Sequence, residues 1–168
     1  MRALDQPIVG AVNGVAAGAG ASLAFACDIR LAAEGASFLL AFGRIGLVPD
    51  SGATWFLPRL VGPAKAAELA LLGESLSAAD AERFGLVARV VAPGELAAEA
   101  RRVAARLTEL APRALALTKA ALQRSWSVDL DDVLEDEAYR QGIVGATADH
   151  EEGLAAFLQK RSPRFTGE

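Results

Sequence analysis

The amino-acid sequence predicts an α/β fold in which short strands come first and helices follow. Apolar runs of four or five residues crowd the first fifty positions between turn-forming residues, as short buried strands do. From residue 51 onward, apolar residues recur mainly at helical spacing. The chain has 168 residues, 52% hydrophobic and 23% charged, which is long and apolar enough for a globular core.

The N-terminal part alternates strands with small-residue segments. Residues 8–12 and Ile29–Ala33 are the clearest strands, and residues 37–41 form a short third one. Residues 14–20 are so small that another group can approach the main chain closely, and we expect a flexible loop there. Residues 21–27 are apolar on all sides, which indicates a buried helix.

The later part is predicted to be largely helical. Pro63 suits the first position of a helix over residues 64–72, which Gly73 ends. Ser77 and Asp80 resemble a capping box for a helix that begins at Ala78 and runs to Phe84. The remaining expected elements are a strand at 86–91, helices at 95–110, 113–126, 130–144 and 151–161, and an irregular tail at 162–168.

Composition and charge exclude several classes of protein. The net charge of −4 and the lack of a basic stripe argue against nucleic acid as the main partner. A single cysteine permits no internal disulfide and indicates a reducing compartment, so we expect a cytoplasmic protein. No apolar run reaches the ~18 residues of a membrane span, and the first residues lack the apolar centre of a signal peptide.

A glycine-rich loop is the first candidate for chemistry. It lacks a nucleotide-binding pattern, because a third glycine would be needed where Leu23 stands. The N–H groups of Ala19 and Gly20 would instead emerge at a helix start, where partial positive charge favours an anion or a developing oxyanion. Tight packing of a helix on a sheet explains the same small residues, so both interpretations stand.

Asp50 is the second candidate, because it is the one acid in an apolar turn. Burial beside Leu47, Val48 and Trp55 would favour the protonated carboxyl and suit it to proton transfer. An N-cap for the helix that begins near Gly52 is an equally good explanation. The two roles are compatible.

Other singular residues favour structural roles. We expect His150 to be a solvated residue at a helix start, and Cys27 to be an inert core thiol. The acidic run at 129–137 fits the wet face of a helix, and no metal site is expected there. Phe157 and Lys160 are spaced to share a helix face. Lys160 suits an anionic group and Phe157 an aromatic ring, although the pattern alone favours a snorkelling lysine beside a core phenylalanine.

These segments, in this order, resemble the crotonase family, also called enoyl-CoA hydratase/isomerase. The resemblance covers essentially the whole chain. It is carried by Pro7-Ile8-Val9-Gly10-Ala11-Val12-Asn13-Gly14, Gly18-Ala19-Gly20, Ala26-Cys27-Asp28-Ile29-Arg30, Gly46-Leu47-Val48-Pro49-Asp50-Ser51-Gly52, Gly85-Leu86-Val87 and residues 152–161. Within the family, residues 49–55 and 160–167 look most like the isomerases of phenylacetate degradation, which rearrange ring-epoxidised phenylacetyl-CoA to an oxepin.

The resemblance implies a fold and partners. It implies an incomplete ββα spiral core over residues 1–92, and a helical trimerisation region over residues 93–168 that builds a homotrimer or hexamer. It implies an acyl-CoA thioester as substrate, with coenzyme A as part of that substrate and no separate cofactor. The first strands, a second oxyanion donor and most of the adenine pocket belong to a further N-terminal stretch of family members.

The resemblance also implies roles for individual residues. The N–H of Ala19 would be one of two donors to the thioester oxygen, and Asp50 would move the proton or assist ring-opening. Phe157 and Lys160 would contact coenzyme A, in the same or a neighbouring subunit. The other expected substrate-binding residues are Gly18, Gly20, Ser22, Phe42 and Trp55.

The sequence departs from the family's hydratases at two positions. Those enzymes place two glutamates around the site to activate water, and this chain has Ser22 and Phe42 there. Asp50 is then the only matching acid, which favours an isomerase over a hydratase. Ala53 also stands where glycine is commoner. A hydratase-like activity, and an inactive fragment or assembly module, are the alternatives.

Overall fold

The computed structural model describes residues 1–168, which form two compact units. The first unit contains Met1 and residues 8–103, and it holds all the strands. The second contains residues 2–7 and 104–168 and holds the C-terminal helices. The boundary between these units lies within α5. The expected division of the family fold after residue 92 stays a prediction.

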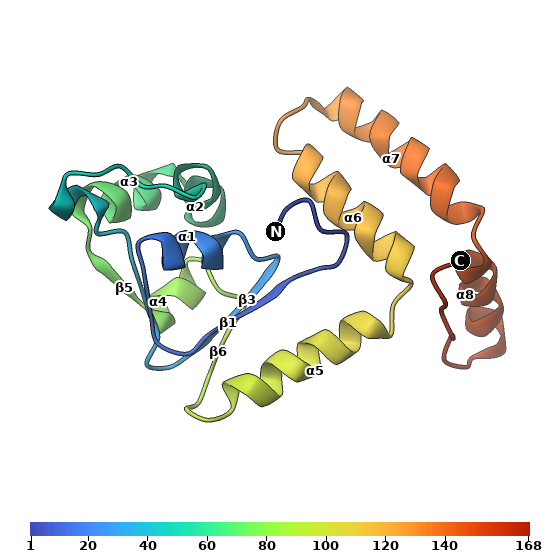
Figure 1. The fold of residues 1–168 in the computed structure, drawn as a ribbon. Helices are drawn as coiled ribbons and strands as arrows, with labels where there is room; N and C mark the ends of the chain where they lie inside the picture. The colour runs from blue at the N-terminus through green and yellow to red at the C-terminus, as the bar shows by residue number, and fades with distance from the viewer. The chain divides into compact units, whose positions relative to one another are not determined.

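Two three-stranded sheets form the framework of the first unit (Figure 1). One sheet has the order β1-β3-β6 and is parallel throughout, with Val9 opposite Ile29 and Leu31 opposite Arg89. In the other sheet β2 is parallel to β4, and β5 is antiparallel to β4. The strands are β1 Val9–Val12, β2 Val15–Ala17, β3 Ile29–Ala33, β4 Ser37–Leu39, β5 Ser75–Ser77 and β6 Arg89–Val91.

Twice, the chain forms a strand of the first sheet, then a strand of the second sheet, and then a helical segment. β1 is followed by β2 and α1, and β3 is followed by β4, η1 and α2. This ββα alternation is the arrangement that the resemblance implies. The helices of the first unit are α1 Ala19–Phe25, η1 Phe42–Ile45, α2 Ala53–Val61, α3 Pro63–Leu72, α4 Ala78–Arg83 and the first part of α5 Leu96–Thr108.

The core of the first unit lies between the sheets and these helices. Its most enclosed large side chains are Leu31, Leu57 and Leu86. Leu31 belongs to a smaller cluster with Ala33 and Leu96, which packs the apolar face of α5 against β3. The expected amphipathic helix near residues 95–110 is therefore confirmed, and its buried stripe covers the parallel sheet.

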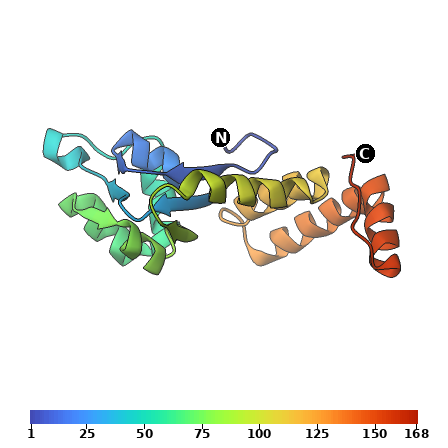
Figure 2. The same ribbon diagram turned by 90° about the horizontal axis from the view of Figure 1, so that it is seen from below.

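The second unit consists of the end of α5, three further helices, the residues after them and the segment at residues 2–7. α6 Pro112–Arg124 packs on α7 Leu130–Gly145, which leads to α8 Ala148–Gln159 (Figure 2). Lys119 Nζ donates to the carbonyl of Gln6 at 2.9 Å, which fastens the N-terminal segment to α6. None of the helices in either unit has the length and apolar character of a membrane span.

Most predicted elements are confirmed, and the errors have local causes. The strand Ile29–Ala33 and the helix that Pro63 begins match the structure. Residues 14–20 are not simply a loop, because β2 lies within them and α1 begins at Ala19, not at residue 21. The sequence did not predict β2 and β5, because three-residue strands rich in alanine and serine leave no clear apolar pattern. It also did not predict η1, a single short 3-10 turn.

Candidate functional site

Gly18 joins β2 to α1 and sets how the helix begins. Its φ of 53° lies in the left-handed region that glycine favours. Its N–H donates to the carbonyl of Leu39 at 2.9 Å, which ties the start of α1 to the end of β4. The first N–H to bond within the helix is that of Ser22, to the Gly18 carbonyl at 3.1 Å. The N–H groups of Ala19 and Gly20 precede that bond and stay outside the helical ladder.

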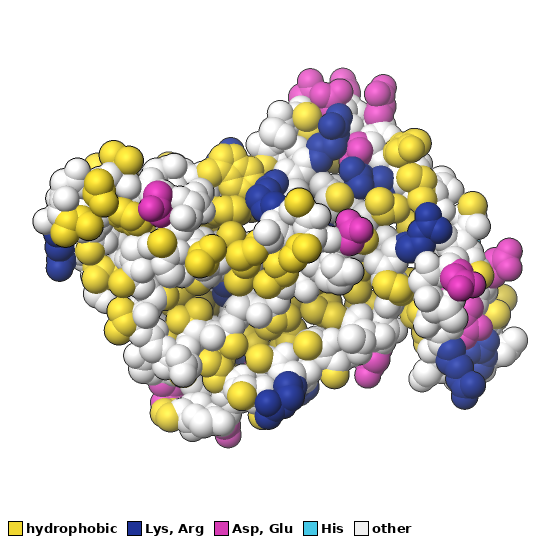
Figure 3. Space-filling model, viewed as in Figure 1, with side chains coloured by type: hydrophobic (Ala, Val, Ile, Leu, Met, Phe, Trp, Pro, Cys, Tyr) yellow, Lys and Arg dark blue, Asp and Glu magenta, His cyan; other side chains and the backbone are white.

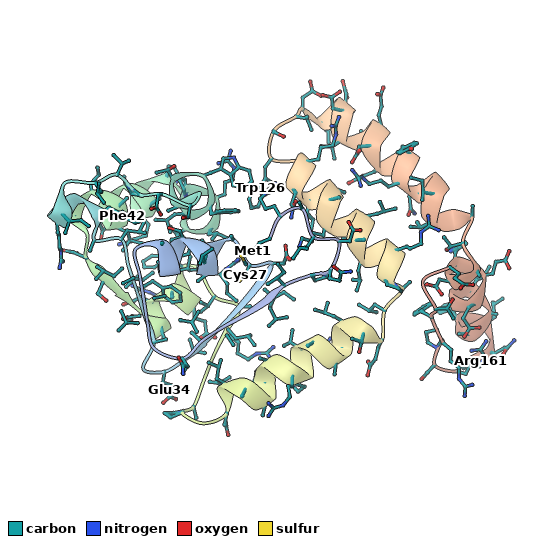
Figure 4. All side chains as sticks on the ribbon, viewed as in Figure 1. Met1, Cys27, Glu34, Phe42, Trp126 and Arg161 are labelled. Carbon is teal, nitrogen blue, oxygen red and sulfur yellow. The ribbon has the colours of Figure 1, made fainter.

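Ser22 and Phe42 enclose this helix start. Ser22 is 0% exposed, and its hydroxyl donates to the Gly18 carbonyl at 3.2 Å. Phe42, labelled in Figure 4, is 7% exposed. Its Cζ lies 3.7 Å from the point where a Cβ on Gly18 would stand. The two positions where the resemblance implies glutamates in hydratases therefore hold an internally bonded hydroxyl and a buried ring.

Asp50 lies in an exposed turn, so the expected burial of its carboxyl is wrong. Leu47 and Val48 are exposed as well. The expected N-cap is also wrong, because Gly52 is the N-cap of α2 and no side chain caps that helix. The physical reason is the backbone: Ser51 and Gly52 are both left-handed, with φ of 52° and 87°. The contact of Asp50 with α2 is through its carbonyl, which accepts from the N–H of Ala53 at 2.9 Å.

Trp55 lies on α2, one turn beyond Asp50, and is half-buried. Its ring meets Phe56 edge-on, with the centroids 4.9 Å apart. The guanidinium of Arg59 lies over the same ring at 4.4 Å from its centroid, a favourable cation–π geometry. Because α1 packs against α2, the helices that carry Ala19 and Trp55 are neighbours.

An apolar cavity of about 290 Å³ lies beside the Asp50 turn. Pro49 and Ala53, which flank that turn, form part of its wall. Thr54 is the one wall residue with a polar side chain. The other wall residues are Leu40, Leu57, Pro58, Pro63, Ala66, Ala67, Ala70 and Leu71.

In the second unit, Phe157 and Lys160 lie at the end of α8. Phe157 is 79% exposed, so the expectation of a core phenylalanine is wrong; its neighbour Ala156 is the buried residue of that turn. Lys160 is exposed and stands one residue beyond the helix, as its left-handed C-cap with φ of 53°. Its N–H donates to the carbonyls of Ala156 and Phe157.

Lys160 and Ser51 are the two residues other than glycine with positive φ. Each stands in a segment that the sequence singled out, Ser51 beside Asp50 and Lys160 as the expected coenzyme A contact. A side chain in this conformation costs roughly 1–2 kcal/mol relative to ordinary helical backbone. Such strain tends to gather at functional sites.

The residues expected to be structural behave largely as predicted. His150 is exposed in the first turn of α8, and Asp129 caps α7 by accepting from the N–H of Asp132. Cys27 departs from expectation, because it lies beyond α1 and is only half-buried. Its Sγ is 2.8 Å from where a Cβ on Gly10 would stand, so a larger residue at position 10 would require the Cys27 side chain to shift.

Sequence reasoning missed two acids that shape the end of the chain. Asp149 and Glu152, in the first turns of α8, hold the residues after Lys160. Acids at a helix start usually face solvent, so their i, i+3 spacing carried no distinguishing signal.

The family model for enoyl-CoA hydratase/isomerase matches residues 1–168. This chain belongs to that family. The curated 1,2-epoxyphenylacetyl-CoA isomerase of Escherichia coli (strain K12) is 47% identical over 164 residues, which cover 98% of this chain and 63% of that protein. A probable enoyl-CoA hydratase of Rhodobacter capsulatus is 47% identical over 161 residues, which cover 96% of this chain and 63% of that protein.

Solved structures give the same result for the fold. The enoyl-CoA hydratase of Bacillus anthracis aligns with a TM-score of 0.97 at 40% identity, over 99% of this chain and 65% of that one. The expected crotonase-like fold is therefore confirmed. The chain spans less than two thirds of the length of these relatives. Their names include both isomerases and hydratases, so membership of the enoyl-CoA hydratase/isomerase family leaves the reaction open.

Proposed function

We propose that this enoyl-CoA hydratase/isomerase family chain serves the isomerisation of a CoA thioester. The observation that carries the proposal is that Ser22 and Phe42 occupy the two positions where the resemblance implies glutamates in hydratases. A buried serine bonded to Gly18 and a buried phenylalanine offer no carboxylate to activate water. Asp50 is the acid that remains, and its exposed carboxylate can reach a bound ligand. A reaction that needs one acid–base group fits this arrangement better than hydration.

The proposed step moves one proton within the substrate. The Asp50 carboxylate takes a proton from the carbon next to the thioester carbonyl, and the C–H electron pair moves into the carbonyl to give an enolate. The N–H of Ala19 donates to the enolate oxygen, with a second donor from outside this segment. Asp50 then returns the proton to the γ-carbon, the double bond shifts, and the carboxylate is regenerated. No atom is gained or lost.

The remaining expected site residues take binding roles in this proposal. Gly18 and Gly20 let the thioester approach the backbone, and Ser22, Phe42 and Trp55 shape the surrounding wall. Phe157 and Lys160 contact the coenzyme A part of the substrate, for which no separate cofactor is needed. A homotrimer or hexamer in the cytoplasm is the proposed setting.

The acyl group is proposed to be apolar, either an enoyl chain or the ring of an epoxidised phenylacetyl group. The cavity of about 290 Å³ beside Pro49 and Ala53 supports this class. An apolar cavity of ~150 Å³ in another protein holds benzene, so a ring or short chain has room here. The isomerase from Escherichia coli named above adds support from sequence.

Hydration is the second candidate, since several relatives bear hydratase names. It requires an acid other than Asp50 to activate water. A third candidate is an assembly module without activity of its own, because the chain spans less than two thirds of its relatives.

Product analysis with two substrates separates these functions. The chain, joined to the N-terminal stretch that the family resemblance implies, is incubated with a β,γ-unsaturated and an α,β-unsaturated acyl-CoA, and double-bond shift and water addition are measured. We expect the shift to dominate, and Asp50→Asn to slow it by about 10²–10⁴-fold. Asp131→Asn, on the exposed face of α7, removes the same charge and should leave the rate unchanged.

Three results would oppose isomerisation. Predominant water addition would favour the hydratase. An unchanged shift rate in Asp50→Asn would remove Asp50 from the reaction. Binding of acyl-CoA without either product would favour the assembly module.

A further inference from the structure

The chain after α8 folds back along that helix as a strap, residues 161–168. Figure 1 shows this tail returning beside α8, and Figure 4 labels Arg161 where the strap begins. Basic and acidic side chains lie together over α8 and the strap (Figure 3). The strap has no regular secondary structure, so its position depends on the groups that hold it.

Glu152 holds the first part of the strap. Both of its carboxylate oxygens accept from the guanidinium of Arg161, at 2.6 and 2.7 Å. It also accepts from the backbone N–H of Arg164 at 2.8 Å. A bidentate pair of this kind fixes orientation as well as distance. The hydrogen bonds from Arg161 and then Arg164 lower the pKa of Glu152 to about 2, so the anchor is ionised at neutral pH.

Asp149 holds the last part of the strap. Asp149 is only 4% exposed. Its two oxygens accept from the N–H groups of Thr166 at 2.7 Å and Gly167 at 2.9 Å. Between the two anchors, the ring of Phe165 packs against α8 at Gly153, 3.5 Å from where a Cβ would stand. The strap is thus held by residues 149–153, which lie within the first two turns of α8.

Lys160 is the residue between the helix and the strap. Its backbone is left-handed, a conformation that lysine rarely adopts on its own. The helix fixes Lys160 on one side through the carbonyls of Ala156 and Phe157, and Glu152 fixes Arg161 on the other. The N–H of Arg161 also donates to the carbonyl of Ala156 at 3.1 Å, so the helix end and Glu152 together hold the backbone on both sides of Lys160.

We propose that Glu152 and Asp149 are positioning residues for Lys160: by anchoring the strap, they hold Lys160 where its ammonium meets the anionic part of a CoA thioester. The inference rests on the proposed function, which gives Lys160 its ligand. Glu152 and Asp149 do not touch the ligand. They remove the conformational freedom that Lys160 would otherwise lose on binding.

The experiment measures strap order and binding in the same full-length variants. Coenzyme A itself, without an acyl group, is titrated by calorimetry, and amide hydrogen exchange is followed over residues 160–168. The variants are Glu152→Gln, which cuts the first anchor, and Lys160→Asn, which removes the ammonium but tolerates the left-handed backbone. Glu151→Gln is the matched control, because it removes the same charge from the adjacent exposed residue.

In Glu152→Gln we expect faster exchange over residues 160–168, unchanged exchange over α6 and α7, and a Kd for coenzyme A about tenfold weaker. A tenfold change in Kd corresponds to the entropic cost of ordering about one backbone residue on binding. Glu151→Gln should match the unaltered chain. Glu152→Asp, which keeps the carboxylate, should recover part of the affinity, whereas a role in stability alone would not move the Kd.

The outcomes separate this inference from the proposed function. Unchanged exchange in Glu152→Gln, or faster exchange with an unchanged Kd while Lys160→Asn loses affinity, would overturn the positioning role and leave the proposed function in place. Normal affinity in Lys160→Asn, or no binding by the unaltered chain, would overturn the coenzyme A contact and this inference with it.

Discussion

Ser51 shows at the scale of one residue how the candidate site is built. Its φ of 52° turns the chain sharply between Pro49 and α2, and this turn leaves Asp50 exposed. The sequence indicated a turn here, because Pro49 and Gly52 flank the acid. It did not indicate two consecutive left-handed residues, since serine is not a residue that requires them. Burial of Asp50 was therefore wrongly expected.

We predict that Ser51→Gly stabilises the chain by about 0.5–1 kcal/mol. Glycine removes the cost of a side chain in the left-handed region, and its greater freedom in the unfolded chain offsets part of the gain. Ser125, with φ of −55°, provides the matched comparison, because Ser125→Gly should destabilise. Urea unfolding midpoints at equal slope provide the measurement. A lower midpoint for Ser51→Gly would show that its hydroxyl has a structural role.

Arg30 illustrates a residue whose role sequence could not reveal. Its guanidinium donates to the carbonyls of Leu86 at 2.6 Å, Phe25 at 3.2 Å and Cys27, and it thereby joins three segments of the first unit. Burial lowers the pKa of Arg30 from its usual value. The motif Cys27-Asp28-Ile29-Arg30 supported the family resemblance, yet a buried arginine that pairs with carbonyls leaves no periodic signal.

At the scale of elements, the helices whose ends carry a capping side chain or a glycine were predicted best. Ser77 caps α4 by accepting from the N–H of Asp80 at 3.1 Å, which is one half of the expected capping box. The carboxylate of Asp80 accepts from the Ser77 hydroxyl at 2.9 Å, and Gly73 ends α3 in the left-handed conformation. β2 and β5 carry no such signal. Their pairing to β4 is a long-range event that local residue patterns do not encode.

The strap along α8 is predicted to release in acid. The folded pKa of Glu152 is lowered from 4.5 to about 2, so its contribution is complete above about pH 4.5 and is lost as the pH falls through 2. The N–H of Arg164, which donates to Glu152, reports the change. Its amide proton shift in NMR should stay constant from neutral pH to about 4 and then move with a midpoint near 2.

Two results would contradict this prediction. A midpoint near 4.5 would mean that Arg161 does not hold Glu152 in solution. The same transition in Glu152→Gln would assign it to another acid.

At the scale of the whole molecule, the family resemblance predicted more than local patterns could. The order of segments from Pro7 to Arg161 led to the crotonase-like fold, which the solved relatives confirm. Local patterns alone indicated only a generic α/β chain. Asp50 and Ala19 lie in the first unit and Lys160 in the second.

Deuterium incorporation tests the central claim, proton transfer by Asp50, most directly. Phenylacetyl-CoA, whose acyl group has no double bond that can shift, is incubated with the chain in D₂O, and deuterium at the carbon next to the thioester carbonyl is followed by NMR. The account predicts incorporation by the unaltered chain and a rate at least 10²-fold lower in Asp50→Asn. Equal incorporation by both proteins, or none by the unaltered chain while it binds the thioester, would contradict it.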